Sequence, residues 1–174
     1  GDTFLDNAII KAQSAAELSG LPVVADDSGL EVDALDGAPG VHSARFAGPE
    51  RDDLANNKRL VEMLRGVPPV KRTARFRCAL VLFVPQAAES SLGRLNNCAR
   101  AVTGGWILNW AGTVEGRIID TPRGKNGFGY DPHFLIVERN RTTAELSSAE
   151  KNAISHRGRA VRAMVARLTE DARP

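Results

Sequence analysis

A short apolar run that stops at two adjacent carboxylates constrains this chain more than any other feature of its sequence. Residues 21–25 are mostly apolar, and Asp26, Asp27, Ser28 and Gly29 follow them directly. An apolar run closed by turn-forming residues predicts a buried strand that leads into a tight loop. Because ligands of α/β proteins usually bind beyond the carboxyl end of a strand, we expect a functional site in this loop.

The two neighbouring carboxylates are expected to take different roles. Successive side chains of a strand point to opposite faces, so Asp26 and Asp27 diverge if the strand geometry persists through them. We predict that Asp27 points at a ligand or a metal ion and that Asp26 serves the backbone of its own loop. The alternative is an ordinary turn, because Asp, Ser and Gly form turns for purely local reasons.

Length and composition are typical of one soluble globular domain over residues 1–174. The chain has 43% hydrophobic and 25% charged residues and a formal charge of +2, which gives no reason to expect a nucleic-acid or membrane partner. Cys78 and Cys98 form neither a metal-binding spacing nor a disulfide framework, which favours a reducing, cytoplasmic compartment. The sequence shows no signal peptide and no long apolar span.

Apolar periodicity and capping residues predict helices and strands along most of the chain. The first helix is expected to start with Asp2 or Thr3 as its cap and to end at Gly20. The other expected elements are a half-buried strand over residues 30–35, a helix from Pro49 to about Arg65, strands over 73–85, 112–119 and 134–137, and two helices capped by Ser147 and Ser155. The expected buried side of the helix from Pro49 consists of Leu54, Leu60, Val61 and Leu64, and that of the last helix consists of Ala160, Val161, Met164, Val165 and Leu168.

Three stretches carry a more specific pattern: residues 25–48 (ADDSGLEVDALDGAPGVHSARFAG), 127–132 (GFGYDP) and 144–160 (AELSSAEKNAISHRGRA). In this order they resemble the inosine triphosphate pyrophosphatase family, also called Ham1-like, and especially its bacterial members. The resemblance implies an α/β fold, with an elongated mixed sheet flanked by helices and two lobes around a central cleft. It also implies a homodimer, since members of the family commonly form one.

Two departures accompany the resemblance. Family members begin with a further strand and a glycine-containing phosphate-binding loop before the first helix, and this sequence starts at that helix. Residues from about 86 to 110 are expected to form an atypical insertion or an altered hairpin, because this connection is longer than usual by about fifteen residues.

The resemblance implies magnesium-dependent hydrolysis of ITP, dITP and XTP to nucleoside monophosphate and pyrophosphate, which cleanses the nucleotide pool. Mg²⁺ prefers oxygen ligands and uses one or two protein carboxylates together with phosphate oxygens. Asp27 is the expected catalytic residue, which would bind the metal and orient or deprotonate the attacking water. Asp6 is the second expected metal ligand, although the family usually carries a Glu there, which is longer by one methylene.

Further residues are expected to bind the triphosphate. Lys11 and Lys151 would supply positive charge to the phosphates, and Ser28 would offer its hydroxyl or its backbone amide. An isolated lysine is more often a solvated surface residue, and Ser28 has the competing role of capping its own turn. For Lys151 the matching context of residues 144–160 favours the functional interpretation.

The purine base has its own expected contacts. The resemblance assigns to its pocket Phe128, Gly129, Tyr130, Asp131, His156 and Arg157. Phe128 offers an aromatic face, and the glycines around it allow close approach of the backbone. Arg157 is always a hydrogen-bond donor, so it would favour the oxygen at purine position 6 of inosine over the amino group of adenosine, and Asp131 would accept from the protonated ring nitrogen.

Two other function classes compete with this interpretation. One is a catalytically impaired purine-nucleotide-binding protein or an enzyme fragment, which the missing phosphate-binding loop favours. The other is a nucleic-acid binder that would rest on Arg72, Arg75 and Arg77. Arg75 and Arg77 alternate along an expected strand, which is more typical of its solvated face.

Overall fold

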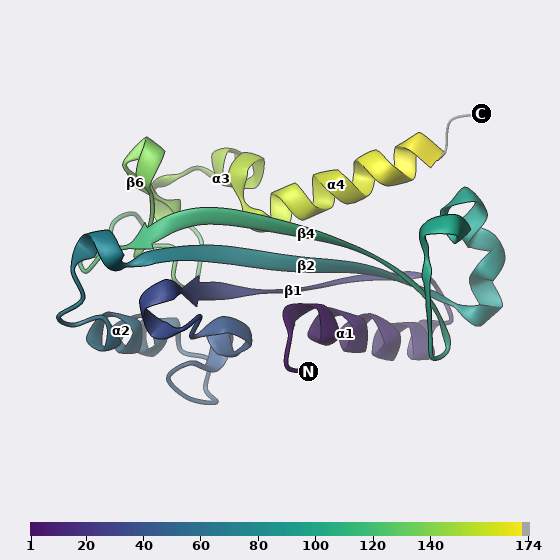
Figure 1. Ribbon diagram of the computed structural model, residues 1–174, viewed down its shortest axis with the longest axis horizontal. Helices are drawn as coiled ribbons and strands as arrows, with labels where there is room; N and C mark the ends of the chain where they lie inside the picture. Colours follow the sequence, from purple (N-terminus) through teal and green to yellow (C-terminus); the bar gives the residue numbers. More distant parts are fainter. Residues whose placement is uncertain (172–174) are drawn as a thin grey trace. The chain divides into compact units, whose positions relative to one another are not determined.

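A mixed α/β architecture, as predicted, is found in the computed structural model, which describes residues 1–171 apart from the side chains of residues 94, 96 and 171 (Figure 1). The sheet follows the order β1-β2-β4-β5-β6, and β3 pairs with β4. Pairings of β4 with β3 and β5, and of β5 with β6, are antiparallel. The strands are β1 (Val23–Val32), β2 (Thr73–Pro85), β3 (Arg100–Val102), β4 (Gly105–Ile118), β5 (Phe134–Ile136) and β6 (Arg141–Thr142).

The chain divides into two compact units, and each of them contains α-helices. The α-helices are α1 (Phe4–Ser19), α2 (Asp53–Met63), α3 (Ser148–Ile154) and α4 (His156–Asp171). Unit 1 contains residues 1–28, 78–112 and 157 onward, and unit 2 contains residues 29–77 and 113–156. The strands β1, β2 and β4 each contribute residues to both units.

In unit 1, helices cover both faces of β2, which explains the uninterrupted apolar run in this strand. Val81 packs with Ala8 and Ala12 of α1. Leu80, the preceding residue, packs with Ala160 of α4. Because neighbouring strand residues point to opposite faces, α1 and α4 lie on opposite sides of the strand, as Figure 1 shows.

The predicted boundaries of the first helix are confirmed. Thr3 is the N-cap of α1, and its hydroxyl accepts a hydrogen bond from the Asp6 backbone N–H at 3.1 Å. Gly20 ends the helix in the left-handed conformation, with φ 69°, which glycine adopts without steric cost. The buried residues of α1 occur at every fourth position: Ala8, Ala12 and Ala16.

The apolar stripe predicted for α4 is only partly right. Ala160, Met164 and Leu168 pack against the strands of unit 1, at intervals of four residues. Val161 and Val165 were expected in the same stripe, but they are 37% and 49% exposed. The covered face of α4 is therefore narrower than the run of apolar residues indicates.

The loop predicted at residues 26–29 is wrong, because β1 continues through them as far as Val32. Leu30 and Val32 are fully buried in the core of unit 2, and this burial holds the strand beyond the two carboxylates. The predicted strand over residues 30–35 is correspondingly shorter, since Asp33–Leu35 forms a turn of 3₁₀-helix.

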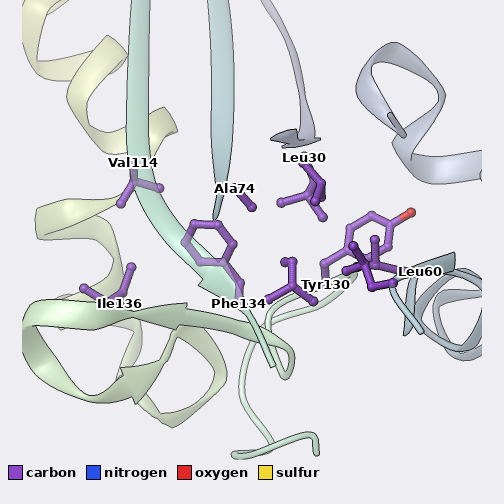
Figure 2. Close-up of a cluster of buried hydrophobic side chains, with 10 residues drawn as sticks. Leu30, Leu60, Ala74, Val114, Tyr130, Phe134 and Ile136 are labelled. Carbon is purple, nitrogen blue, oxygen red and sulfur yellow. The ribbon is translucent and has the colours of Figure 1, made fainter. Parts of the chain in front are cut away.

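The core of unit 2 combines residues of the sheet with residues of α2. Figure 2 shows this cluster, in which Leu30, Ala74, Val114 and Phe134 of four strands meet Leu60 of α2. All but Val114, which is 5% exposed, have no exposed surface. Burial of this apolar surface is the main force that holds the unit together.

The start and the buried side of α2 differ from the prediction. Asp52, rather than Pro49, begins the helix, and its carboxylate accepts hydrogen bonds from backbone N–H groups of the first turn. Leu60 and Leu64 are buried as predicted, but Leu54 is 82% exposed. A carboxylate cap satisfies N–H groups of the first turn, whereas a proline side chain has no atom that can accept a hydrogen bond.

The stretch between β2 and β4 forms short 3₁₀ turns over Gln86–Cys98 and then the hairpin of β3 and β4. Leu92 and Leu95 of this stretch pack with Leu108 of β4. β4 is one continuous strand, which starts at Gly105 rather than at the predicted residue 112. Within residues 1–171, no helix is both long and apolar enough to cross a membrane.

Acid should weaken unit 2 through the capping box that begins α3. Glu150 accepts hydrogen bonds from Arg141 Nη1 and from the Ser147 backbone N–H, both at 2.8 Å, and these lower its pKa from 4.5 to about 2. A lowered pKa gives stability that is present above about 4.5 and lost as the pH falls towards 2.

We therefore expect the unfolding temperature of Glu150→Gln to depend less on pH than that of the parent chain across this window. Thermal unfolding followed by circular dichroism at a series of pH values measures the difference. Glu62→Gln, which changes an exposed carboxylate on α2, should follow the parent curve. Parallel curves for Glu150→Gln and the parent chain would contradict the assignment.

Candidate functional site

In unit 1, Asp27 lies on the face of β1 that α1 covers. Its Oδ1 atom lies 2.5 Å from Lys11 Nζ, and its Oδ2 atom accepts a hydrogen bond from Asn7 Nδ2 at 3.1 Å. Asn7 and Lys11 are four residues apart on α1, so both face the strand. The Asp27 side chain is only 16% exposed, whereas that of Lys11 is 53% exposed. The helix thus holds a carboxylate in a fixed orientation at the edge of solvent.

Asp26 points the other way and binds the first residues of α4. Its Oδ2 atom accepts hydrogen bonds from Arg157 Nε and Nη2, at 3.1 and 2.9 Å, and from the Ser28 hydroxyl at 2.8 Å. Burial raises the pKa of Asp26, but the hydrogen bonds from Arg157 and Ser28 outweigh it and hold the pKa below its ordinary value. The carboxylate is therefore a charged partner of Arg157.

The predicted divergence of the two carboxylates is thus found, in a strand rather than a loop. Asp26 was expected to serve the backbone of a loop, and this expectation is wrong because no loop forms there and its partners are side chains. Cys78 lies beside it, with Sγ 3.8 Å from Asp26 Oδ2. Burial raises the pKa of this thiol, so it is kept neutral.

Asp6, the second expected metal ligand, is exposed on α1. Its Oδ2 atom accepts a hydrogen bond from the Thr3 hydroxyl at 2.7 Å, which ties it to the helix cap. Among residues 1–171, no three His, Cys, Asp or Glu side chains gather in a way that could hold a metal ion. A cation at Asp27 would therefore take most of its ligands from phosphate oxygens and water, which is the usual situation for Mg²⁺.

In unit 2, the stretch Gly127–Asp131 forms a tight loop whose glycines have different roles. Gly127 has φ 78°, and a Cβ atom there would lie 2.0 Å from Asp131 Oδ2, so only glycine fits. Gly129 has φ 60° and open space around it, so here the left-handed backbone angle is what requires glycine. The close approach of this backbone to the purine base stays a prediction for both glycines.

Asp131 is the buried centre of this loop. Its residue is 2% exposed, and its carboxylate accepts hydrogen bonds from the Phe128 backbone N–H at 2.8 Å, the Thr143 hydroxyl at 2.8 Å and Lys151 Nζ. A buried charge is costly unless it is paired and hydrogen-bonded, and these partners meet both conditions. The carboxylate therefore fixes the loop, and α3 contributes to it through Lys151.

Phe128 presents its ring to solvent above this buried network. The residue is 67% exposed, which is unusual for a large aromatic side chain. Lys151 Nζ lies 4.9 Å from the ring centroid, within the range of a cation–π contact. The loop backbone and the Lys151 cation thus support the ring, and its exposed side can receive a flat ligand.

Tyr130 and His156, two further predicted base contacts, are packed in unit 2. Tyr130 is 4% exposed, and its hydroxyl donates to the Ser43 carbonyl oxygen at 2.8 Å, while burial raises its pKa. The His156 ring stacks on Phe76, with centroids 5.1 Å apart and an interplanar angle of 15°. Tyr130 thus supports the Phe128 loop from the core, and Phe76 orients the His156 ring.

Two residues of these arrangements were not predicted as functional. Asn7 binds Asp27, and its spacing of four residues from Lys11 on a helix was a signal that the two act together. Thr143 binds Asp131 from a position where it is 4% exposed, and a lone threonine gives no such signal.

Comparison with known proteins gives a consistent result. The sequence model of a protein family described as the Ham1 family matches residues 1–167. A dITP/XTP pyrophosphatase of Bacillus licheniformis is 47% identical over 170 residues, which are 98% of this chain and 78% of that protein. One of Exiguobacterium sibiricum is 50% identical over 169 residues, which are 97% and 76%. A solved HAM1 protein of Coxiella burnetii superimposes with a TM-score of 0.83 at 44% identity, covering 98% of this chain and 78% of that one.

Removal of Lys151 should destabilise the chain, because it leaves the buried Asp131 carboxylate without its cation. We expect Lys151→Met to lower the free energy of unfolding by about 3 kcal/mol. Adding Asp131→Asn to this variant removes the unpaired charge and should restore part of the loss. Urea unfolding measures both effects, and Lys125→Met, an exposed lysine of the same unit, is the control. Equal stability of Lys151→Met and Lys125→Met would contradict the structural role of the pair.

Proposed function

The chain belongs to the Ham1 family, and on that basis we propose that it hydrolyses dITP, ITP and XTP to nucleoside monophosphate and pyrophosphate. The observation that carries the proposal is the Asp27 carboxylate, which Lys11 and Asn7 hold in one orientation beside solvent. The names of the similar proteins, dITP/XTP pyrophosphatases, supply the substrate class. A homodimer stays a prediction of the family resemblance, and a cytoplasmic location stays a prediction from the two cysteines.

The reaction needs a water molecule to attack the α-phosphate, so that the bond to the pyrophosphate leaving group breaks. In this proposal Asp27 orients that water and accepts its proton. Lys11 has an exposed side chain next to Asp27 and offers its positive charge to the phosphates. Ser28 follows on the opposite face of β1, where its hydroxyl donates to Asp26, so its backbone amide is the group we propose for substrate.

A divalent cation, which we propose is Mg²⁺, would be held by Asp27 and would neutralise phosphate charge when bound. The chemistry of the donors fits such an ion, because Asp27 offers carboxylate oxygens that the surrounding helix already orients. Asp6 is the proposed second ligand and is exposed, so it is accessible to an ion that retains water. With such a cation bound, the chain itself has to bind the nucleotide and to position the attacking water.

Recognition of the base is proposed for Phe128 and Arg157. The exposed face of Phe128 can stack on a purine, an interaction that aromatic side chains provide for every base. Arg157 offers donors only, and these suit the oxygen at purine position 6 of inosine and xanthosine better than the amino group of adenosine. Asp131 is buried and bound to Lys151, so we propose that it acts by shaping the loop.

Loss of the Asp27 carboxylate should abolish most of the activity. We expect Asp27→Asn to lower kcat for dITP by about 100-fold or more, because general base catalysis contributes about 10²–10⁴-fold. Magnesium-dependent release of pyrophosphate measures the effect. Glu17→Gln, an exposed carboxylate on α1, is the control and should be fully active. Release of orthophosphate instead of pyrophosphate would exclude the proposed site of attack.

Substrate selectivity tests the base contacts separately. We expect kcat/KM for dITP to exceed that for dATP by about 100-fold or more, since a pocket whose polar groups match one purine rejects a base that leaves them unpaired. The two substrates are compared in the same pyrophosphate assay. Equal values for both would show that the chain does not distinguish deaminated purines. Binding of dITP without any release of product would favour a nucleotide-binding protein.

A further inference from the structure

α2 holds both backbone groups of Gly129, at the tip of the Phe128 loop. Asp53 Oδ2 accepts a hydrogen bond from the Gly129 N–H at 2.6 Å, and Asn57 Nδ2 donates to the Gly129 carbonyl oxygen at 2.8 Å. Asp53 and Asn57 are four residues apart and therefore share one face of the helix. They lie 76 and 72 residues from Gly129 in the sequence, so these are tertiary contacts between α2 and the loop.

The contacts with α2 hold the loop at Gly129, where side-chain packing does not. Gly129 has no side chain, and nothing lies within 4 Å of the position where its Cβ would be. Phe128, the preceding residue, is 67% exposed. Backbone hydrogen bonds therefore hold the loop on both sides of this point, one from the Phe128 N–H to Asp131 and two between Gly129 and α2, in addition to the buried Tyr130 and the cation of Lys151.

The same helix is itself anchored in the core of unit 2. Leu60 of α2 and Leu64, its C-cap, are fully buried and belong to one cluster with Tyr130, and Figure 2 shows Tyr130 beside Leu60. Asn57 is 7% exposed and also donates to the Asp53 carbonyl oxygen, one turn earlier in the helix. Asn57 thus has a fixed position, and Asp53 is exposed but lies one turn earlier on the same anchored helix, as a positioning device requires.

We propose that Asp53 and Asn57 are positioning residues that pre-orient Phe128 for the purine base and so determine the affinity for the nucleotide. This inference rests on the proposed function, since it assumes that Phe128 stacks on the substrate. A loop that is already ordered loses less conformational entropy on binding than a mobile one. Neither residue touches the reacting phosphates in this proposal, so the effect falls on KM and leaves kcat unchanged.

The decisive variants are Asp53→Ala, which removes the acceptor, and Asp53→Asn, which keeps an acceptor oxygen at the same position. We expect Asp53→Ala to raise KM for dITP about tenfold with kcat within about twofold, and Asp53→Asn to restore most of the affinity. Asn57→Asp replaces the donor by an acceptor that faces two carbonyl oxygens, and it should also raise KM.

Asp52→Ala is the matched control for helix stability. Asp52 caps α2 through the Leu54 and Ala55 N–H groups and has no hydrogen bond to Gly129. This variant should lower the unfolding temperature and leave KM unchanged. If it raised KM as much as Asp53→Ala does, a general weakening of α2 would explain both results and the positioning role would be refuted.

Two further measurements separate this inference from the proposed function. Hydrogen–deuterium exchange of the peptide containing Gly129 should be faster in Asp53→Ala than in the parent chain, whether or not the chain is an enzyme. Calorimetric titration with inosine monophosphate compares affinities without turnover. Faster exchange with unchanged affinity would overturn the positioning role alone, and unchanged exchange would overturn the loop contact. Absence of both nucleotide binding and pyrophosphate release in the parent chain would refute the proposed function.

A double variant tests whether the effect passes through Phe128. Phe128→Ala removes the ring, so adding Asp53→Ala to it should raise KM by much less than Asp53→Ala does alone. If the two increases in KM multiply instead, Asp53 acts on the substrate by another route, and the proposed path through Phe128 is wrong.

Discussion

The alternation of side chains along β1 is the constraint on which the arrangement of unit 1 depends. Because β1 stays extended through Asp26 and Asp27, neighbouring carboxylates point to opposite faces of one strand. α1 meets Asp27 with Lys11, and α4 meets Asp26 with Arg157. Each helix thus supplies the cation for the carboxylate on its own face, and two like charges that are adjacent in sequence are kept apart.

How far the sequence predicts this arrangement depends on the separation of the interacting residues. The cap of α1 at Thr3 and the capping box at Ser147 involve residues three positions apart, so local patterns were sufficient. Arg157 lies 131 residues from Asp26, and nothing in either segment indicates their pairing. The continuation of β1 was missed for the same reason, since the burial of Leu30 depends on α2 and the other strands.

The carboxylate that fixes the Phe128 loop in unit 2 is buried, whereas Asp27 in unit 1 pairs with Lys11 at the edge of solvent. Asp131 has a 4% exposed side chain and three hydrogen-bond partners, so its network is satisfied and specifies one conformation of the loop. Family resemblance identified the residues of this loop but did not indicate which of them support it from below and which one is accessible. Asp131 and Tyr130 are supports below the surface, and Phe128 is the residue that they leave accessible.

The two lysines expected to bind phosphate differ in the same way. The Lys11 side chain is 53% exposed, and Asp27, whose side chain is 16% exposed, has a second partner in Asn7. Lys11 can therefore turn towards an anionic substrate while Asn7 still binds Asp27. The Lys151 side chain is 19% exposed, and its departure would leave Asp131 charged and buried. We therefore propose that Lys11 binds phosphate and that Lys151 supports the Phe128 loop.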